Sequence, residues 1–234
     1  MSIYQLDNRL WFPDPRGGNE KGLIAVGGDL SYKRLLLAYS HGIFPWFSFR
    51  AHEEAQWFCP MNRFVIFPKE IHVSHSMKQM LKQKKYCVTF NQDFDGVIRG
   101  CAEVDGRINE YGAWLGKDII EAYTELHEDG YVASVEVWEN PDPASENPDP
   151  ASENQKPRLV GGLYGVAVRN IFVGESMFSL VPSASKLALI HLARKLEEKE
   201  GTLIDCQFET PHLKSMGGRF IPYDQYMEIM NSDM

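Results

Sequence analysis

The stretch Leu159-Val-Gly-Gly-Leu-Tyr-Gly-Val-Ala-Val168 is followed, after only Arg169 and Asn170, by Ile171-Phe-Val173. Both runs are rich in apolar and β-branched residues, which favour strands over helices. Two intervening residues are too few for a crossover, so they indicate a short turn. The sequence therefore predicts two adjacent strands at this point.

Outward from this pair, strand-like runs alternate with segments of helical periodicity. The other predicted strands are 64–67, 86–90, 132–138 and 202–204, and the predicted helices are 74–83, 92–102, 118–129, 183–199 and 223–230. Strands and helices mixed in this way, with adjacent strands joined by short turns, predict an α/β or α+β domain with a mixed sheet.

The beginning of the chain differs in composition, because it is rich in proline, glycine and aromatic residues. Within it, residues 30–39 are predicted to form a short helix with Ser31 as its N-cap. We expect a small N-terminal domain at residues 1–62, built of short elements, and a larger domain at residues 63–234.

Composition limits the classes of protein to which the chain can belong. Of its 234 residues, 44% are hydrophobic and 24% are charged, which suits a globular protein with a full core. No apolar stretch reaches the roughly 18 residues of a membrane span, and the first residues do not resemble a signal peptide. We therefore expect a cytoplasmic protein without a membrane partner.

The cysteines argue against a metal or redox site. Cys59, Cys87, Cys101 and Cys206 lie far apart and form no C-x-x-C pair. His72 and His75 are three residues apart, with no cysteine or carboxylate at ligand spacing around them. We expect no bound metal.

The formal net charge of −8 argues against a protein that coats itself in nucleic acid, since non-specific affinity comes from lysine and arginine. A local basic patch remains possible at Lys78, Lys82, Lys84 and Lys85. Lys78 and Lys82 are four residues apart and share a face if the segment is helical. A solvated helix face would give the same pattern.

Residues 140–146, Asn-Pro-Asp-Pro-Ala-Ser-Glu, recur unchanged at 147–153. Two prolines in each heptad exclude a central strand, and no side chain larger than alanine is available for burial. We expect a mobile loop at 140–154 between the strands 132–138 and 158–168. A duplication in a tolerant loop explains it at least as well as a docking motif.

Two short segments carry polar residues next to predicted strands. In Ile204-Asp205-Cys206-Gln207-Phe208, strand alternation places Asp205 and Gln207 on one face and Cys206 on the other. An isolated aspartate at a strand end is also a common cap or turn residue.

In Val173-Gly-Glu-Ser-Met-Phe-Ser179, the same alternation pairs Glu175 with Met177 and turns Ser176 and Phe178 the other way. A carboxylate beside a flexible apolar side chain is suited to a mixed pocket, and equally to a salt bridge at a strand edge. The segment begins like the G-x-S-x-G turn of serine hydrolases, but Phe178 replaces the last glycine.

Nucleotide cofactors are not supported. Gly161-Gly-Leu-Tyr-Gly165 has neither the G-x-G-x-x-G spacing nor the strand-to-helix position of a dinucleotide site, and the Walker pattern does not occur. We expect no cofactor.

Several blocks together resemble the leucyl/phenylalanyl-tRNA-protein transferase family, in the family's order from about residue 9 to residue 226. The longest blocks are Gly22–Leu30, Ala38–Ser48, Glu121–His127, Ser134–Trp138, Gly161–Ala167, Gly174–Ser179 and Leu203–Gln207. Gly42-Ile-Phe-Pro-Trp-Phe47 and Gly174-Glu-Ser-Met-Phe-Ser179 are the most specific.

The resemblance implies a small N-terminal domain followed by a catalytic domain with an acetyltransferase-like (GNAT-like) fold. It implies that leucine or phenylalanine moves from an aminoacyl-tRNA to the α-amino group of a protein that begins with Lys or Arg. The product would be marked for degradation. No cofactor is implied.

The resemblance also implies functional residues. Glu175, Asp205 and Gln207 match polar active-site positions, Trp46 and Trp114 match aromatic positions at the aminoacyl-adenosine site, and Tyr39 and Tyr123 match neighbouring tyrosines. The apolar amino-acid pocket would consist of Leu163, Phe172, Met177, Leu189, Leu192, Leu196 and Ile204. The chain departs from the family in the all-leucine pattern of its pocket helix, in a shorter C-terminus and in the duplicated heptad.

The implied reaction needs little from the protein, because an aminoacyl ester is already activated. The enzyme must position an amine against the carbonyl and help remove a proton. Three alternatives remain: an acyl-CoA-dependent acetyltransferase, a serine hydrolase that uses Ser176, and a non-catalytic module that recognises protein N-termini.

Overall fold

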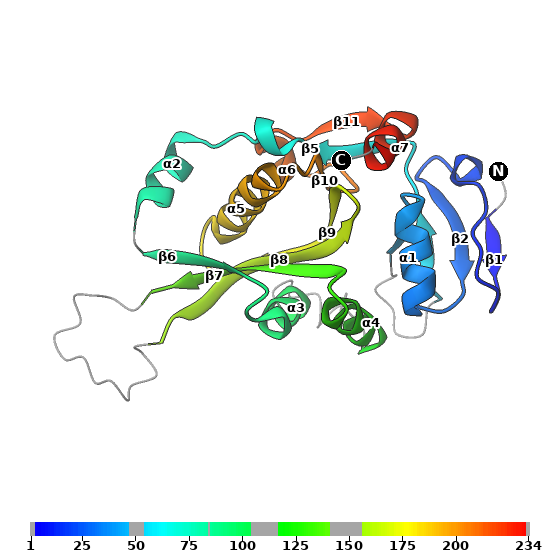
Figure 1. The fold of residues 1–234 in the computed structure, drawn as a ribbon, viewed down its shortest axis with the longest axis horizontal. Helices are drawn as coiled ribbons and strands as arrows, with labels where there is room; N and C mark the ends of the chain where they lie inside the picture. Colours follow the sequence, from blue (N-terminus) through cyan, green and yellow to red (C-terminus); the bar gives the residue numbers. More distant parts are fainter. Residues whose placement is uncertain (1–2, 47–53, 84, 104–116, 141–155, 233–234) are drawn as a thin grey trace.

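The computed structural model describes residues 3–46, 54–83, 85–103, 117–140 and 156–232. Its strands form two sheets, one of four strands and one of seven, and helices flank both (Figure 1). The predicted mixture of strands and helices in a mixed sheet is therefore confirmed. Almost all of the duplicated heptad, residues 141–153, lies outside the described residues. Lys84 and Trp114 also lie outside them.

The four-stranded sheet comes from the beginning of the chain. Its order is β1-β2-β4-β3, with β1 at Tyr4–Leu6, β2 at Leu23–Gly27, β3 at Phe44–Trp46 and β4 at Gln56–Phe58. Helix α1, Tyr32–Ser40, joins β2 to β3 and confirms the predicted helix, with Ser31 at the N-cap position. Trp57 is fully buried, and its Nε1 donates to Gly27 O at 2.8 Å.

The seven-stranded sheet has the order β11-β5-β10-β9-β8-β7-β6. Its strands are β5 Asn62–Ile66, β6 Tyr86–Phe90, β7 Val132–Glu139, β8 Arg158–Val168, β9 Ile171–Ser179, β10 Leu203–Asp205 and β11 Arg219–Pro222. The six predicted strands are all present, and β9 continues to Ser179, beyond the run that was predicted. Strand β11 was not predicted.

The turn predicted at Arg169 and Asn170 is confirmed, because Val168 of β8 pairs with Ile171 of β9 in an antiparallel ladder. Strands β9 and β10 are parallel, whereas the other neighbouring strands of this sheet are antiparallel. Helix α5, Ala184–Glu198, makes the crossover between β9 and β10.

Helices cover both faces of the large sheet (Figure 1). Helices α3, Phe94–Glu103, and α4, Lys117–Glu128, pack on one face, while α5 and α2, His75–Lys82, lie on the other. The chain ends with α6, Pro211–Ser215, and α7, Tyr223–Asn231. The five helices predicted in this part of the chain are confirmed, and α6 was missed.

Two apolar clusters follow from this layering. One cluster includes residues of α1, α3, α4, α7, the small sheet and the face of the large sheet that α3 and α4 cover. The other includes residues of α5 and the opposite face of the large sheet. They are called here the α3/α4-side core and the α5-side core. No helix among the described residues is both long and apolar enough to cross a membrane.

Candidate active site

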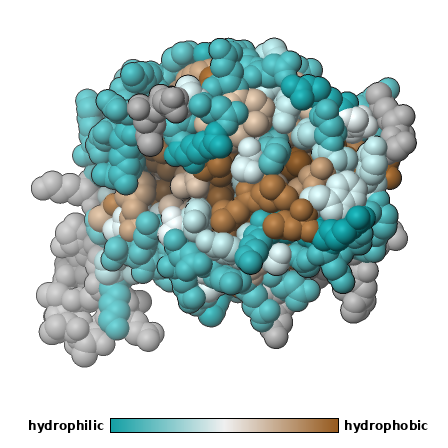
Figure 2. Space-filling model, turned by 45° about the vertical axis from the view of Figure 1, so that its right-hand side comes forward, coloured by the Kyte–Doolittle hydropathy of each residue, from teal (hydrophilic) through white to brown (hydrophobic). Residues whose placement is uncertain are grey.

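A cavity opens where β10 ends beside β9. Strand β10 pairs with Ile171–Val173 and stops at Asp205, so β9 loses this neighbour from Gly174 onward. A cavity of about 480 Å³ lies at this gap, which is within the range of small-molecule sites. Figure 2 shows apolar residues gathered in a hollow in the middle of one face, inside a hydrophilic rim.

The wall of the cavity is largely apolar. Six of the seven residues expected in an amino-acid pocket line it: Leu163, Phe172, Met177, Leu189, Leu192 and Ile204. Leu196, the seventh, is not among the lining residues; it lies one turn further along α5, beside Gly201. Thr210, His212 and Leu213 complete the wall from the α6 side and were not predicted from the sequence.

A β-bulge places Glu175. Tyr164 of β8 pairs with Ser176 and Gly165 pairs with Gly174, so Glu175 has no partner on β8. A bulge of this kind reverses the alternation of side chains and is frequent next to active sites. The prediction that Glu175 and Met177 share a face is therefore wrong: Glu175 contacts tyrosines of the α3/α4-side core, and Met177 packs against the α5-side core.

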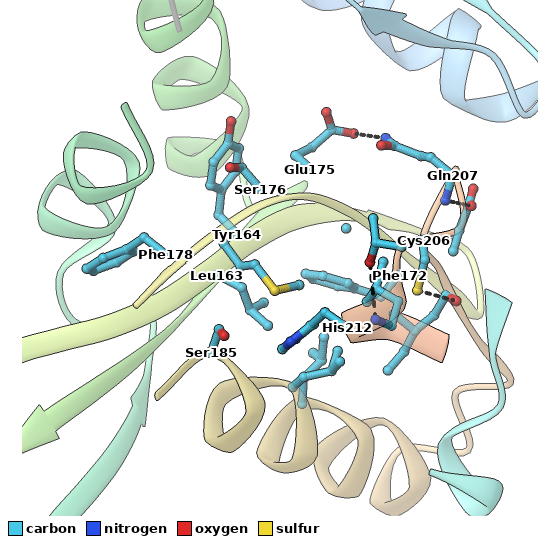
Figure 3. A pocket seen from close by; sticks show the side chains of 18 of the residues that line it. Leu163, Tyr164, Phe172, Glu175, Ser176, Phe178, Ser185, Cys206, Gln207 and His212 are labelled. Atoms are coloured by element: carbon cyan, nitrogen blue, oxygen red, sulfur yellow. Dashed lines mark hydrogen bonds between the residues drawn. The ribbon is translucent and has the colours of Figure 1, made fainter. Parts of the chain in front are cut away.

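Figure 3 shows the consequence, with Glu175 and Ser176 on one side of β9 and Leu163 and His212 on the other. Glu175 and Gln207 thus lie at one end of the cavity, and most of the remaining lining residues are apolar. Ser176 Oγ is not hydrogen-bonded to any histidine in the described part of the chain. That observation disfavours the serine hydrolase alternative.

Glu175 accepts hydrogen bonds from three side chains. Tyr39 Oη donates to Oε1 at 2.7 Å, Tyr123 Oη donates to Oε2 at 3.0 Å, and Gln207 Nε2 donates to Oε1 at 3.2 Å. Burial raises the pKa of Glu175 to about 7, although the two tyrosine hydroxyls lower it. The carboxyl group can therefore gain or lose a proton near neutral pH.

The proton count agrees with this pKa. The hydroxyls of Tyr39 and Tyr123 are also hydrogen-bonded to each other, which closes a ring of three contacts with Glu175. Burial, and then the charge of Glu175, raise the pKa of both tyrosines well above the ordinary value, so each hydroxyl keeps one proton. When Glu175 is ionised, both hydroxyls donate to it and no proton lies between them; when Glu175 is protonated, it donates to one tyrosine and all three contacts have a proton.

Gln207 is held in an unusual backbone conformation. Its φ is 63°, and the N–H of Phe208 donates to the carbonyl of Cys206 at 2.7 Å. These features define a γ-turn with positive φ, which is rare and strained. The turn directs the Gln207 amide toward Glu175 (Figure 3).

Asp205 lies beneath this turn, fully buried. Its Oδ1 accepts the N–H of Gln207 at 2.8 Å, and its Oδ2 accepts from Arg63 Nη1 at 3.0 Å and from Tyr226 Oη at 2.9 Å. The side chain of Asp205 contacts Tyr226 and that of Gln207 contacts Glu175, both on the side of the α3/α4-side core, whereas Cys206 packs against the α5-side core. The side chain of Asp205 acts on Gln207 through the backbone.

Arg63 completes a buried ion pair that the sequence did not reveal. Burial disfavours its charge and is the largest single influence, but Asp205, Tyr226 and Cys59 together outweigh it and raise the pKa of Arg63. Its Nη2 donates to the carbonyl of Gly42, and its guanidinium lies 4.9 Å from the Phe44 ring centroid. The pair thus joins the large sheet to the small sheet.

Trp46 lies at the edge of the small sheet, next to the turn at Gln207. Its ring centroid is 4.4 Å from that of Phe208 and 5.8 Å from that of Phe58. Trp46 and Tyr39 thus come from the small N-terminal part, while Glu175 and Gln207 come from the large sheet. Trp114 lies outside the described residues, so its position relative to Trp46 stays a prediction.

Lys78, Lys82 and Lys85 are not among the residues that line the cavity. Lys78 and Lys82 are exposed on α2, as the helical spacing predicted. Lys85 is exposed at the start of the β6 segment, and its Nζ lies 3.2 Å from Glu139 Oε1, so part of its charge is already neutralised. Lys84 lies outside the described residues.

His212 is a further cavity residue that sequence reasoning missed. Its Nε2 is buried and has no hydrogen-bond partner among the described residues. Burial, followed by the charge of Lys186, lowers the pKa of His212, so the ring is neutral at pH 7. In the described segments, no three histidine, cysteine, aspartate or glutamate side chains are grouped so as to hold a metal ion.

The sequence matches two family models. The model described as leucyl/phenylalanyl-tRNA protein transferase matches residues 65–146 and 149–231, and the model of that family's N-terminal domain matches residues 28–61. The second match supports a small N-terminal domain, while the boundary at residue 62 stays a prediction. The first match is interrupted inside the duplicated heptad.

Curated relatives agree over the full length. A protein of Syntrophus aciditrophicus named leucyl/phenylalanyl-tRNA–protein transferase is 44% identical over 234 residues, which is 100% of this chain and 90% of the relative. Proteins of the same name from Flavobacterium psychrophilum and Pectobacterium carotovorum are 42% and 44% identical, over 97% and 99% of this chain and 99% and 91% of the relatives.

A crystal structure of FemX aligns with 82% of this chain and 66% of its own, at a TM-score of 0.48 and 10% identity, a likeness too low to carry an argument. Two family models and three full-length relatives agree with each other and with the resemblance of the sequence motifs. The chain belongs to the leucyl/phenylalanyl-tRNA protein transferase family.

Proposed function

We propose that this chain transfers leucine or phenylalanine from an aminoacyl-tRNA to the N-terminal amino group of an acceptor protein. Full-length identity of 41–44% to proteins with that name supports the activity. The single structural observation that carries it is the Glu175–Gln207 pair at the end of an apolar cavity. The cavity takes the apolar side chain, and the pair faces the ester.

The chemistry follows from these two groups. The acceptor amine attacks the ester carbonyl, a C–N bond forms, and the bond from the carbonyl carbon to the ribose oxygen breaks. The proton that the attacking nitrogen loses on becoming an amide passes to the ribose oxygen. An α-ammonium group, with an ordinary pKa of about 7.7 to 8.0, must lose a proton before it attacks. Glu175, with a pKa of about 7, is matched to accept that proton. Gln207 positions the amine.

The charge of Glu175 bears on which acceptor proteins the site can bind. The ionised form of Glu175 suits a cationic ligand, and it is consistent with acceptors that begin with Lys or Arg. The transferred residue would mark such a protein for degradation, which is a cytoplasmic role. Tyr39, Tyr123 and Asp205 serve as positioning residues, because they contact Glu175 or the backbone of Gln207.

Three finer assignments belong to the same proposal. The parallel strands β9 and β10, which separate at the cavity, support an acetyltransferase-like arrangement of the catalytic domain. Trp46 and Trp114 would hold the terminal adenosine, and Lys78, Lys82, Lys84 and Lys85 would contact tRNA phosphates. Lys85 is expected to contribute least, because Glu139 is already its partner.

The test is incubation with radiolabelled leucyl- or phenylalanyl-tRNA and a peptide that starts with Arg, followed by sequencing of the product. A labelled residue ahead of the arginine is expected. Parallel reactions contain acetyl-CoA in place of the aminoacyl-tRNA, or a peptide with a blocked amino group. Acetylation of the peptide, or peptide binding without turnover, would instead favour one of the two remaining alternatives.

A further inference from the structure

The γ-turn at Gln207 needs an explanation, because an L-residue adopts φ near 63° only when its surroundings hold it there. Glutamine has no short polar side chain to stabilise this conformation locally. The turn also follows directly on the last residue of β10. Contacts on either side of Gln207 must therefore supply the restraint.

One restraint comes from the chain before Gln207. The N–H of Cys206 donates to the carbonyl of Phe64 at 2.9 Å, and the N–H of Gln207 donates to Asp205 Oδ1 at 2.8 Å. These bonds fix the entry to the turn. On the exit side, the N–H of Phe64 reaches the carbonyl of Gln207 at 3.5 Å, a long contact that restrains the exit only weakly.

The exit is fixed by Phe208. Its half-buried ring makes T-shaped contacts with Trp46 at 4.4 Å, Phe44 at 5.7 Å and Phe58 at 6.3 Å between ring centroids. All three partners belong to the small sheet, whereas Gln207 and Phe208 follow the large one. The residue directly after the strained position is thus anchored to a different part of the molecule.

We propose that Phe208 is a positioning residue for transfer: its ring, seated between Trp46 and Phe44, holds the turn that directs the Gln207 amide at Glu175. This inference rests on the proposed role of Gln207. Without the ring contacts the backbone relaxes to an ordinary negative φ, and the amide moves away from Glu175 Oε1.

The experiment compares Phe208→Leu, Phe208→Tyr and Gln207→Ala with the unaltered chain. Phe12→Leu is the matched control, since Phe12 is also half-buried and makes a T-shaped contact with Trp57 at 4.8 Å. The single-turnover rate at saturating phenylalanyl-tRNA, the Kd of that tRNA and the melting temperature are measured for each. Phe208→Met replaces Phe208→Leu if the latter does not fold, because methionine fills the space without a planar ring.

We expect Phe208→Leu to lower the single-turnover rate about tenfold or more while the Kd changes roughly threefold or less. Phe208→Tyr keeps the ring and should restore the rate. Phe12→Leu should lower the melting temperature by a similar amount without this loss of rate. In the Gln207→Ala background, Phe208→Leu should cost little more, because residues that act as a unit are non-additive.

The outcomes separate the two ideas. An unchanged rate in Gln207→Ala would overturn the role of Gln207 and, with it, this inference. A slow Gln207→Ala enzyme together with a normal Phe208→Leu enzyme, or losses that multiply in the double variant, would overturn the role of Phe208 alone. Equal losses of rate in Phe12→Leu and Phe208→Leu would show that the ring only stabilises the fold.

Discussion

At the scale of single residues, the site depends on how one carboxyl group is surrounded. Glu175 is half-buried, accepts from two tyrosines and one amide, and has a pKa of about 7. Removal of water raises the pKa, and donors to the ionised form lower it. The balance leaves a group that can accept a proton at neutral pH and return it afterwards.

This balance predicts how Glu175 affects stability. Its pKa is 4.5 ordinarily and about 7 in the folded chain, so folding favours the protonated form. The contribution to the free energy of unfolding is therefore full below pH 4.5 and is lost as the pH rises through about 7. Between pH 4.5 and pH 8, the free energy of unfolding of the unaltered chain should therefore fall by about 1 to 3 kcal/mol more than that of Glu175→Gln, which cannot ionise.

Urea denaturation at the two pH values measures this difference, and the other titrating groups cancel between the two proteins. A stability difference that does not vary with pH would contradict the raised pKa.

Tyr39→Phe is the companion variant in the transfer assay. This variant loses a hydrogen-bond donor that lowers the pKa of Glu175, so the pKa should rise. As the pH is lowered, the transfer rate should therefore begin to fall at a higher pH than in the unaltered chain.

At the scale of elements, sequence periodicity predicted most of the architecture. The five predicted helices of the larger domain and the six predicted strands lie in apolar or periodic segments, where packing and local preference agree. The apolar wall was also predictable, through the family resemblance. Strand β11 and helix α6 were missed because each buries a single side chain, Ile221 in β11 and Leu213 in α6, so neither segment shows an apolar run or period.

The polar half of the site was harder to predict, for two physical reasons. The bulge at Glu175 depends on pairing with β8, and a single extra residue reverses every face assignment that follows it. The partner of Asp205 is Arg63, which is 142 positions earlier in the chain and carries no local sign of burial. A buried ion pair is a tertiary property, which periodicity does not report.

Helix α2 carries the prediction about tRNA. Lys78 and Lys82 are exposed on one helix, so Lys78→Ala combined with Lys82→Ala should weaken tRNA binding with little dependence on tRNA sequence. Each lost phosphate contact should reduce the slope of log K against log salt by roughly 0.7 to 0.9. Binding is measured between low and moderate salt.

Lys85→Ala should change the slope less, because Glu139 is already its partner. Lys21→Ala, an exposed lysine of the small N-terminal part, serves as the control for a loss of charge alone. If the slope of the α2 double variant equals that of Lys21→Ala, the lysines of α2 form only a solvated face.

At the scale of the whole molecule, the site is assembled from both sheets. Tyr39 and Trp46 come from the small sheet and its helix, and Glu175 and Gln207 from the large one. The family match, in contrast, is interrupted within the duplicated heptad. The site residues and the duplicated heptad should therefore respond differently to mutation.

The duplicated heptad should be dispensable. Deletion of residues 147–153 leaves one complete copy, and the segment has no large apolar side chain to bury. We expect the single-turnover rate and the melting temperature to stay the same within error. A clear fall in either quantity would show that the second copy contributes to folding or to substrate binding.

The ion pair between Arg63 and Asp205 should be far less tolerant, because both side chains are fully buried. Asp205→Asn leaves Arg63 without a counter-charge, so it should lower the free energy of unfolding by about 3 to 5 kcal/mol. Arg63→Met added to Asp205→Asn removes both charges and should recover part of that loss. Urea denaturation of the two single variants and the double variant measures the coupling.

Turnover then separates the two functions of Asp205. The Asn side chain still offers an oxygen to the N–H of Gln207, whereas Ala offers none. Under conditions in which all variants are folded, the single-turnover rate should therefore fall in the order unaltered chain, Asp205→Asn, Asp205→Ala. Equal rates for Asp205→Asn and Asp205→Ala would mean that the bond to Gln207 does not matter and that only the charge of Asp205 is required.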